Sequence, residues 1–92
     1  MLLIVFNKTN RRLFEIQRAI VLFNIEAGYE NLVLKKIKTV EGVEESYITY
    51  GVHDIAVKVR ADSMEALKDL ISNQLRKIKK VRSTISLILV VE

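Results

Sequence analysis

The chain contains no cysteine, no proline and no tryptophan, and it has one histidine among 92 residues. Without cysteine, disulfide bonds, thiolate metal sites and a cysteine nucleophile are all excluded. The single histidine comes without HExxH or EF-hand spacing, so we expect neither a metal site nor any other cofactor. The three glycines stand singly at Gly28, Gly42 and Gly51, so no glycine-rich phosphate loop is present.

The N-terminal apolar run is too short to cross a membrane. Residues 1–6 are apolar, but Asn7 and Lys8 end the run far short of the roughly 20 residues that span a bilayer. The run also lacks the preceding positive region and the small-residue cleavage site of a signal peptide. We therefore expect a cytoplasmic protein with no membrane partner.

The composition is that of one small globular domain. Half of the residues are apolar and 28% are charged, and 92 residues suffice for one domain but not for two. The net charge is +4, and the basic residues cluster at Arg11 and Arg12, in residues 35–38 and in residues 76–82. A nucleic-acid surface is one interpretation of these clusters. Lysines that complement the dipoles of helix C-termini are the interpretation we favour, because acidic residues are interspersed.

Hydrophobic periodicity predicts alternating strands and helices from residue 18 onward. In chain order these are strand 18–26, helix 29–40, strand 43–50, turn 51–54, strand 55–60, a helix from 62 to about 77, and strand 83–92. Asp62 and Glu65 form a capping-box-like pair at the second helix, and Leu32 belongs to the apolar stripe of the first. The order β-α-β-β-α-β predicts an α+β, ferredoxin-like fold, with an antiparallel sheet and two helices on one face.

The first and last predicted strands are apolar on both faces, in residues 20–23 and 87–91. The helices can cover only one face of the sheet, so a monomer would expose a larger apolar patch than soluble proteins usually tolerate. We therefore expect a homo-oligomer, at least a twofold dimer with sheet facing sheet. Coverage by the chain's own N-terminal segment is the alternative.

Residues 1–17 form an N-terminal extension before the domain of residues 18–92. The apolar stretch 2–6 has strand composition, and we expect it to pair with another strand, for which a dimer partner is the favoured candidate. Residues 7–17 are interpreted as a linker or a short helix.

The pattern does not favour catalysis or RNA binding. RNA-recognition domains share this topology but stack bases on aromatic side chains of the central strands, where this chain has only Phe23. His53 and Asp54 are the one acid–base pair worth weighing, and adjacent residues on an extended chain point to opposite sides. We expect no enzyme, with a small enzyme of the dimeric α+β barrel type and a non-specific nucleic-acid binder as alternatives.

Four segments of the sequence, taken in order, resemble one known family. They are AIVLFNIEAGYE, IKTVEGVEESYITYG, YGVHDIAVKVRADSMEALKDLI and IKKVRSTISLILVVE. Over residues 18–92 the chain resembles the effector-binding (RAM) domain of the Lrp/AsnC transcriptional regulators. Many members have Pro-Gly at two turns where this chain has Ala27-Gly28 and Glu41-Gly42, which are turn substitutions that keep the fold. The resemblance implies a ferredoxin-like dimer that assembles further, into an octamer or decamer, with amino-acid effectors bound between dimers.

A full regulator of this family also carries a helix-turn-helix of about 50 to 60 residues, which 17 residues cannot hold. The resemblance is therefore to the stand-alone form of the domain, an amino-acid sensor that modulates transcriptional regulation. Co-assembly with a full-length Lrp/AsnC regulator is one route to that role. We expect no specific DNA binding by this chain alone, and any binding should fade as salt rises.

The resemblance also implies an effector site, made from the turn between the second and third strands and the last strand of a neighbour. By position, its residues are Tyr50, Gly51, His53, Asp54, Ser83, Thr84 and Ser86. The Asp54 carboxylate suits the ammonium of an amino acid, while backbone N–H groups near Gly51 and the hydroxyls of Thr84 or Ser86 suit its carboxylate. An ordinary polar turn and strand start are the alternative interpretation.

Overall fold

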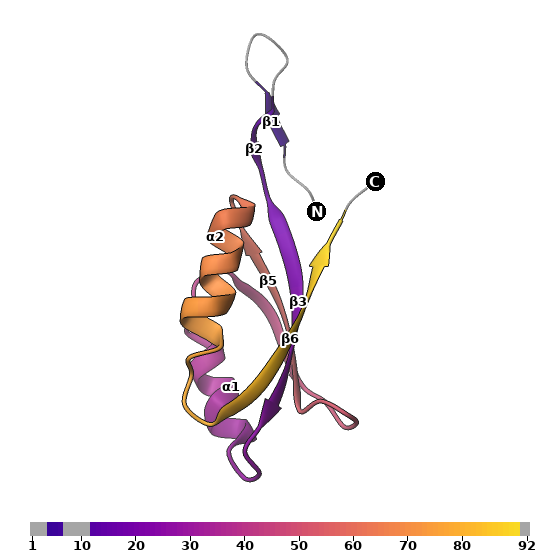
Figure 1. The fold of residues 1–92 in the computed structure, drawn as a ribbon, viewed down its shortest axis with the longest axis vertical. Helices are drawn as coiled ribbons and strands as arrows, with labels where there is room; N and C mark the ends of the chain where they lie inside the picture. Colours follow the sequence, from indigo (N-terminus) through magenta and orange to yellow (C-terminus); the bar gives the residue numbers. More distant parts are fainter. Residues whose placement is uncertain (1–3, 7–11, 91–92) are drawn as a thin grey trace.

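The computed structural model describes residues 4–6 and 12–90 and folds them into helices packed on one face of a sheet (Figure 1). The elements are β1 (Ile4–Phe6), β2 (Arg12–Glu15), β3 (Gln17–Ile25), α1 (Glu30–Lys38), β4 (Val43–Ile48), β5 (Ile55–Ala61), α2 (Met64–Asp69), η1 (Leu70–Leu75) and β6 (Val81–Leu89). The main sheet is antiparallel with strand order β4-β5-β3-β6. The predicted α+β, ferredoxin-like fold is confirmed.

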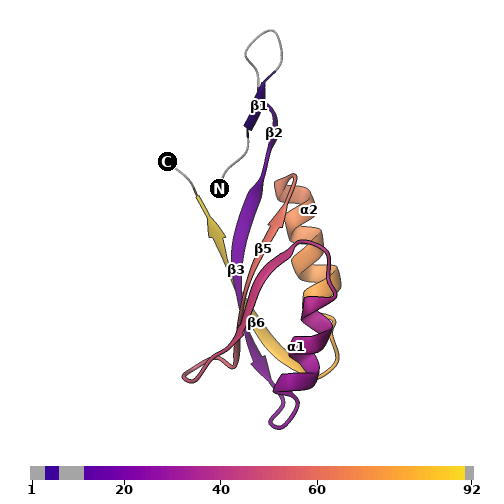
Figure 2. The same cartoon turned by 180° about the vertical axis from the view of Figure 1, so that it is seen from behind.

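The core lies between the sheet and the helices, because β3 and β5 each turn alternate apolar side chains toward α1, α2 and η1. Its buried members are Ala19, Val21, Phe23, Ile25, Val33, Ile37, Ile55, Val57, Val59, Leu67, Leu70, Ile71 and Leu75. The intervening β3 side chains, Ile20 and Leu22 among them, are half-buried. Within one chain β3 is thus buried on one face only, and the opposite face of the sheet is not covered by helices (Figure 2).

The predicted helices are present, with three differences in detail. Ser63 and not Asp62 caps α2, since the Ser63 hydroxyl accepts the Ala66 N–H at 3.0 Å and the helix begins only at Met64. The predicted Asp62–Glu65 capping box is therefore wrong. Beyond α2 the helix continues with the wider, π-helical turns of η1. It ends at Leu75, earlier than predicted. Leu32, expected in the core, is 62% exposed on α1.

The N-terminal extension contains a small hairpin. β1 confirms the strand predicted within residues 2–6, but β2 shows that a linker or short helix was wrong for residues 12–15, because these residues pair antiparallel with β1. The hairpin projects beyond the end of the sheet and does not lie over its open face (Figure 1). Residues 1–3 and 7–11, also part of that expectation, lie outside the described residues. Pairing of this segment across a dimer stays a prediction.

None of the helices in the described part of the chain is both long and apolar enough to span a bilayer.

Candidate functional site

The predicted effector turn is the end of the β4–β5 hairpin, which projects away from the helices (Figure 1). Its tip is open to solvent, because Tyr50 is fully exposed and Gly51 and Val52 are exposed as well. Its base is ordered by two hydrogen bonds of Thr49. The Thr49 N–H donates to the Asp54 carbonyl at 2.9 Å, and the Thr49 hydroxyl donates to the His53 carbonyl at 2.7 Å. The hairpin therefore presents an exposed tip on a fixed base.

Asp54 ties this turn to the neighbouring strand β3. Its N–H donates to the Phe23 carbonyl at 2.8 Å, and its carboxylate Oδ2 accepts from the Ile25 N–H at 2.7 Å. A carboxylate that accepts a backbone N–H in this way makes a charge-assisted bond, stronger than a bond between neutral groups. Among the described residues, no hydrogen bond to the second oxygen, Oδ1, is found.

His53 brings an unsatisfied polar atom to the same place. Its side chain is half-buried, and Nδ1 is buried with no hydrogen-bond partner in the part of the chain that the structure describes. Buried polar atoms in native proteins nearly always have a partner, so an atom of this kind calls for an explanation. His53 Nδ1 is thus a buried, unsatisfied polar atom beside the exposed tip of the turn.

The three predicted residues of β6 lie on opposite faces of the sheet, because successive strand residues alternate. Ser83 is on the open face, where its hydroxyl accepts from Asn24 Nδ2 at 3.0 Å. Thr84 and Ser86 are on the helix face and line a cavity of ≈ 340 Å³, together with Lys68, Ile71, Ser72, Arg76 and Ile88. Within one chain, Ser83 therefore cannot share a pocket with Thr84 and Ser86.

Strand β3 separates the turn from the β6 residues. Phe23 pairs with Ile55 at the base of the hairpin on one side and with Thr84 on the other. Two strand spacings amount to roughly 10 Å. The structure thus brings the four turn residues together, and Thr84 together with Ser86, but it does not join the two groups in one protomer. Their meeting across a neighbour stays a prediction.

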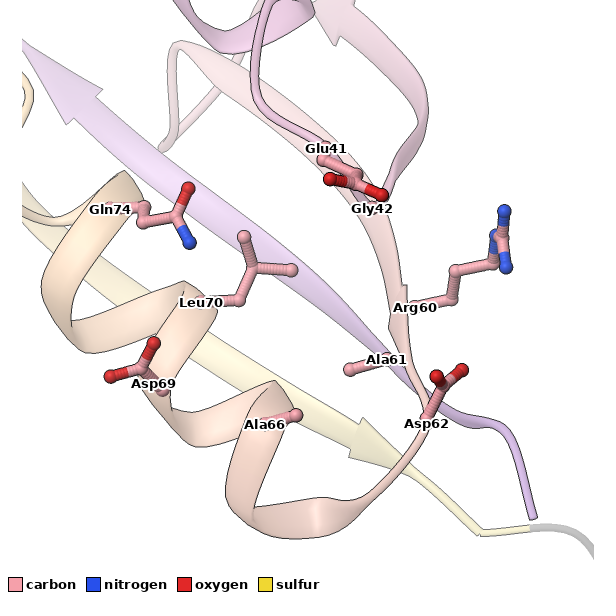
Figure 3. Close-up of a pocket in the computed structure, with 9 residues that line it drawn as sticks. All are labelled: Glu41, Gly42, Arg60, Ala61, Asp62, Ala66, Asp69, Leu70 and Gln74. Atoms are coloured by element: carbon pink, nitrogen blue, oxygen red, sulfur yellow. The ribbon is translucent and has the colours of Figure 1, made fainter. Parts of the chain in front are cut away.

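A separate hollow of ≈ 320 Å³ lies between α2 and η1, the end of β5 and the turn before β4 (Figure 3). Leu70 points into it, whereas the Arg60 side chain turns outward. Three carboxylate residues line it, Glu41, Asp62 and Asp69, and none of the seven predicted site residues does. Across the described residues no group of three or more His, Cys, Asp or Glu is placed to hold a metal ion.

The open face of the sheet carries an ion-pair network that sequence patterning did not reveal. Arg18 donates from Nε and a terminal nitrogen to the two Glu44 oxygens at 2.9 and 3.2 Å, and Arg60 Nε lies 3.6 Å from Glu44 Oε2. A register shift between Val43 and Glu45 lets both Glu44 and Glu45 lie on this face. The hydrogen bond from Arg18 holds the pKa of Glu44 below its ordinary value of 4.5.

The remainder of the open face divides into an apolar half and a polar half. On β3 and β6, Ile20 pairs with Leu87 and Leu22 with Ile85, and both β6 side chains are about half exposed. On β4 and β5, the Tyr47 hydroxyl donates to Glu45 Oε1 at 2.6 Å and Lys58 Nζ lies 3.7 Å from Glu45 Oε2. The open face therefore has an apolar strip on β3 and β6, beside charged side chains on β4 and β5 that are paired with one another.

Comparison with known proteins agrees with this architecture. The family model of the Lrp/AsnC ligand binding domain matches residues 18–92. The crystal structure of FFRP-DM1 superposes with a TM-score of 0.78 at 31% identity, covering 80% of this chain and 99% of that one. A search of curated protein sequences finds no match.

Two longer proteins share the domain. Escherichia coli AsnC matches with a TM-score of 0.77 and 26% identity over 83% of this chain and 52% of its own. The feast or famine regulatory protein of Mycobacterium tuberculosis, solved in complex with L-methionine, matches with a TM-score of 0.70 and 26% identity. The match covers 83% of this chain and 51% of that protein. The chain thus spans about half the length of these two proteins. By its sequence match and its fold, the chain belongs to the Lrp/AsnC ligand-binding domain family.

Proposed function

We propose that the chain is an amino-acid-sensing, oligomerising domain that modulates transcriptional regulation and performs no catalysis. The observation that carries the site is His53 Nδ1, buried without a hydrogen-bond partner among the described residues, in the turn to which the resemblance to the family assigns the effector. The relative solved with L-methionine supports a free amino acid as the ligand class.

The ligand would be held by its two charged ends. Its ammonium would bind Asp54 Oδ1, the carboxylate oxygen that the Ile25 N–H does not use. Its carboxylate would accept from backbone N–H groups near Gly51 and from the hydroxyls of Thr84 or Ser86 of a neighbouring chain. His53 Nδ1 would gain a partner from the ligand or from that neighbour. The distance between the two groups within one protomer is the reason for placing the site between chains.

Self-association supplies that neighbour. The apolar strip of Ile20, Leu22, Ile85 and Leu87 is open in a single chain, and a second copy that docks sheet to sheet would cover it. We extend this to a ring of dimers, an octamer or decamer, in which the effector turn of one dimer meets β6 of the next. Ligand then shifts the assembly only by its difference in affinity between the assembled and dissociated states.

The test combines calorimetry with all common amino acids and native mass measurement with and without each of them. At least one amino acid should bind below millimolar concentration and change the distribution of oligomers. His53→Ala should weaken that binding by about tenfold, the order expected for one lost hydrogen bond to a buried group. Lys35→Gln, an exposed change on α1, is the control and should leave the affinity unchanged.

If no amino acid binds below millimolar concentration and none shifts the assembly, the sensor proposal fails. A structural role in co-assembly with a full-length Lrp/AsnC regulator then becomes the better account. Mixing the chain with such a regulator and measuring mixed species by native mass tests that role directly. A nanomolar complex of the chain alone with one DNA sequence at physiological salt would contradict the expected absence of specific DNA binding.

A further inference from the structure

A groove of ≈ 610 Å³ lies on the helix side of the molecule, between α1, η1 and the connection from η1 to β6. Leu32, Val33 and Ile78 give it an apolar floor, and the lining is completed by Lys36, Asn73, Gln74, Lys77, Lys79 and Lys80. None of these residues belongs to the proposed effector site. The volume falls within the range of roughly 300–1,000 Å³ that is typical of small-molecule sites.

The charged groups that line this groove are all lysines. Lys80 already has partners within the chain. Its Nζ lies 3.6 Å from Glu26 Oε2 and 4.4 Å from the centre of the Tyr29 ring. Lys36, Lys77 and Lys79 have no ion pair with any residue that the structure describes. Like charges gathered around one concave surface repel each other, so an anion bound among them lowers the electrostatic energy.

The apolar floor of the groove indicates that the ligand also has an apolar part. Leu32 is 62% exposed, whereas the other apolar residues of the floor, Val33 and Ile78, are buried or half-buried. An apolar ligand body placed here would remove the Leu32 side chain from water, and burial of such surface is favourable. A ligand with a free ammonium group would find lysines and no carboxylate in this lining.

We propose that this groove binds a small apolar anion, a carboxylate with an aliphatic or aromatic body and no ammonium group. Its negative end lies among Lys36, Lys77 and Lys79, and its body lies on Leu32 and Ile78. This ligand class differs from the zwitterionic amino acid of the proposed effector site. The two sites share no residue, so either proposal can fail without the other.

The test uses the full chain with octanoate as the probe and octylammonium as its cationic counterpart. Methyl and amide shifts in NMR titrations report where each compound binds. Octanoate should perturb Leu32, Val33 and Ile78 and should bind at least about tenfold more tightly than octylammonium, because only the anion gains charge-assisted contacts. Equal affinity for the two compounds, or octanoate shifts centred on Ile85 and Leu87 of the open sheet face, would overturn the proposal.

Two double variants with equal loss of charge separate the groove from general electrostatics. Lys36→Gln with Lys77→Gln should raise the octanoate dissociation constant about tenfold. Lys35→Gln with Lys38→Gln, on α1 but outside the groove, should change it by less than about twofold, because long-range effects between exposed charges are screened. Equal weakening in both would sink the specific site.

The single variant Leu32→Gln tests the floor without any change of charge. Its position on the surface makes the fold insensitive to it, which thermal unfolding verifies. It should weaken octanoate and leave amino-acid binding at the β4–β5 turn as it was. Octanoate affinity that stays unchanged in Leu32→Gln would contradict a ligand body resting on this side chain.

Discussion

The carboxylate of Asp54 accepts a hydrogen bond from the backbone N–H of Ile25 at 2.7 Å, which fastens the β4–β5 turn to the last residue of β3. Asp54 is also the residue that the proposed function assigns to the ammonium of an amino acid. One carboxylate oxygen serves the fold, and the proposed function assigns the other to the ligand. The two roles are separable, because the first needs only an acceptor oxygen and the second needs a negative charge.

Two substitutions of Asp54 therefore have different outcomes. Asp54→Asn keeps an oxygen for the Ile25 N–H but removes the charge, so it should weaken amino-acid binding about ten- to a hundredfold and lower the stability less than Asp54→Ala does. Asp54→Ala leaves that N–H without its acceptor and should also lower the free energy of unfolding by about 1–3 kcal/mol. Urea unfolding and calorimetry measure the two quantities. Equal amino-acid affinity in wild type and Asp54→Asn would remove Asp54 from the binding site.

The open face of the sheet is tested by a charge placed in its apolar strip. Leu87 lies on this face opposite Ile20, so Leu87→Lys would put an unpaired ammonium into a sheet-to-sheet interface. Assembly should weaken by several kcal/mol, seen as a shift toward monomer in sedimentation at micromolar concentration. Leu32→Lys makes the same change on α1 and should leave the dimer intact. Identical sedimentation of both variants and wild type would contradict this interface.

Gly42 is a position where the backbone geometry admits almost no other residue. Its φ is +99°, and an added Cβ would lie 2.8 Å from the Arg60 carbonyl oxygen and 3.0 Å from Leu70 Cδ2. Gly42→Ala should lower the free energy of unfolding by more than about 1–3 kcal/mol, since a clash with backbone adds to the cost of a positive φ. Gly28→Ala is the matched control, with φ +92° and open space around the added Cβ. Urea unfolding should rank Gly42→Ala as clearly the more damaging of the two.

The order of strands and helices could be predicted from the sequence because each element carries its own period. The alternation on Ile55, Val57 and Val59 and the helical stripe on Leu67, Leu70 and Ile71 both point to one core, and the structure buries all six. The match of the YGVHD turn to the family likewise placed its residues on a hairpin. These are local patterns, which short-range periodicity reveals.

Features that depend on register or on tertiary contact could not be predicted. A β-bulge puts both Glu44 and Glu45 on the open face, whereas strict alternation puts them on opposite faces. The hydrogen bond between Asp54 and Ile25 joins residues 29 positions apart. The opposite facing of Ser83 and Thr84, in contrast, follows from strand alternation alone, so the sequence is enough to predict it.

The ion pair of Arg18 with Glu44 makes the stability of the fold depend on pH. The hydrogen bond from Arg18 lowers the folded-state pKa of Glu44 below the ordinary value of 4.5, so the folded state favours the ionised carboxylate. This contribution to stability is fully present above pH 4.5 and is lost as pH falls through the lower, folded pKa. Because the pair lies at the surface and is partly screened, Glu44→Gln should lower the free energy of unfolding by only about 0.5–1 kcal/mol at pH 7.

That difference should shrink below pH 4.5 and vanish once Glu44 is protonated in the wild type as well. Urea unfolding of wild type and Glu44→Gln at a series of pH values from 7 to about 2 measures it. Glu65→Gln provides the control, since the Glu65 carboxylate has no ion pair with the described residues. A gap between wild type and Glu44→Gln that persists undiminished at the acid end would show that the carboxamide harms packing and that the charge on Glu44 does not stabilise the fold.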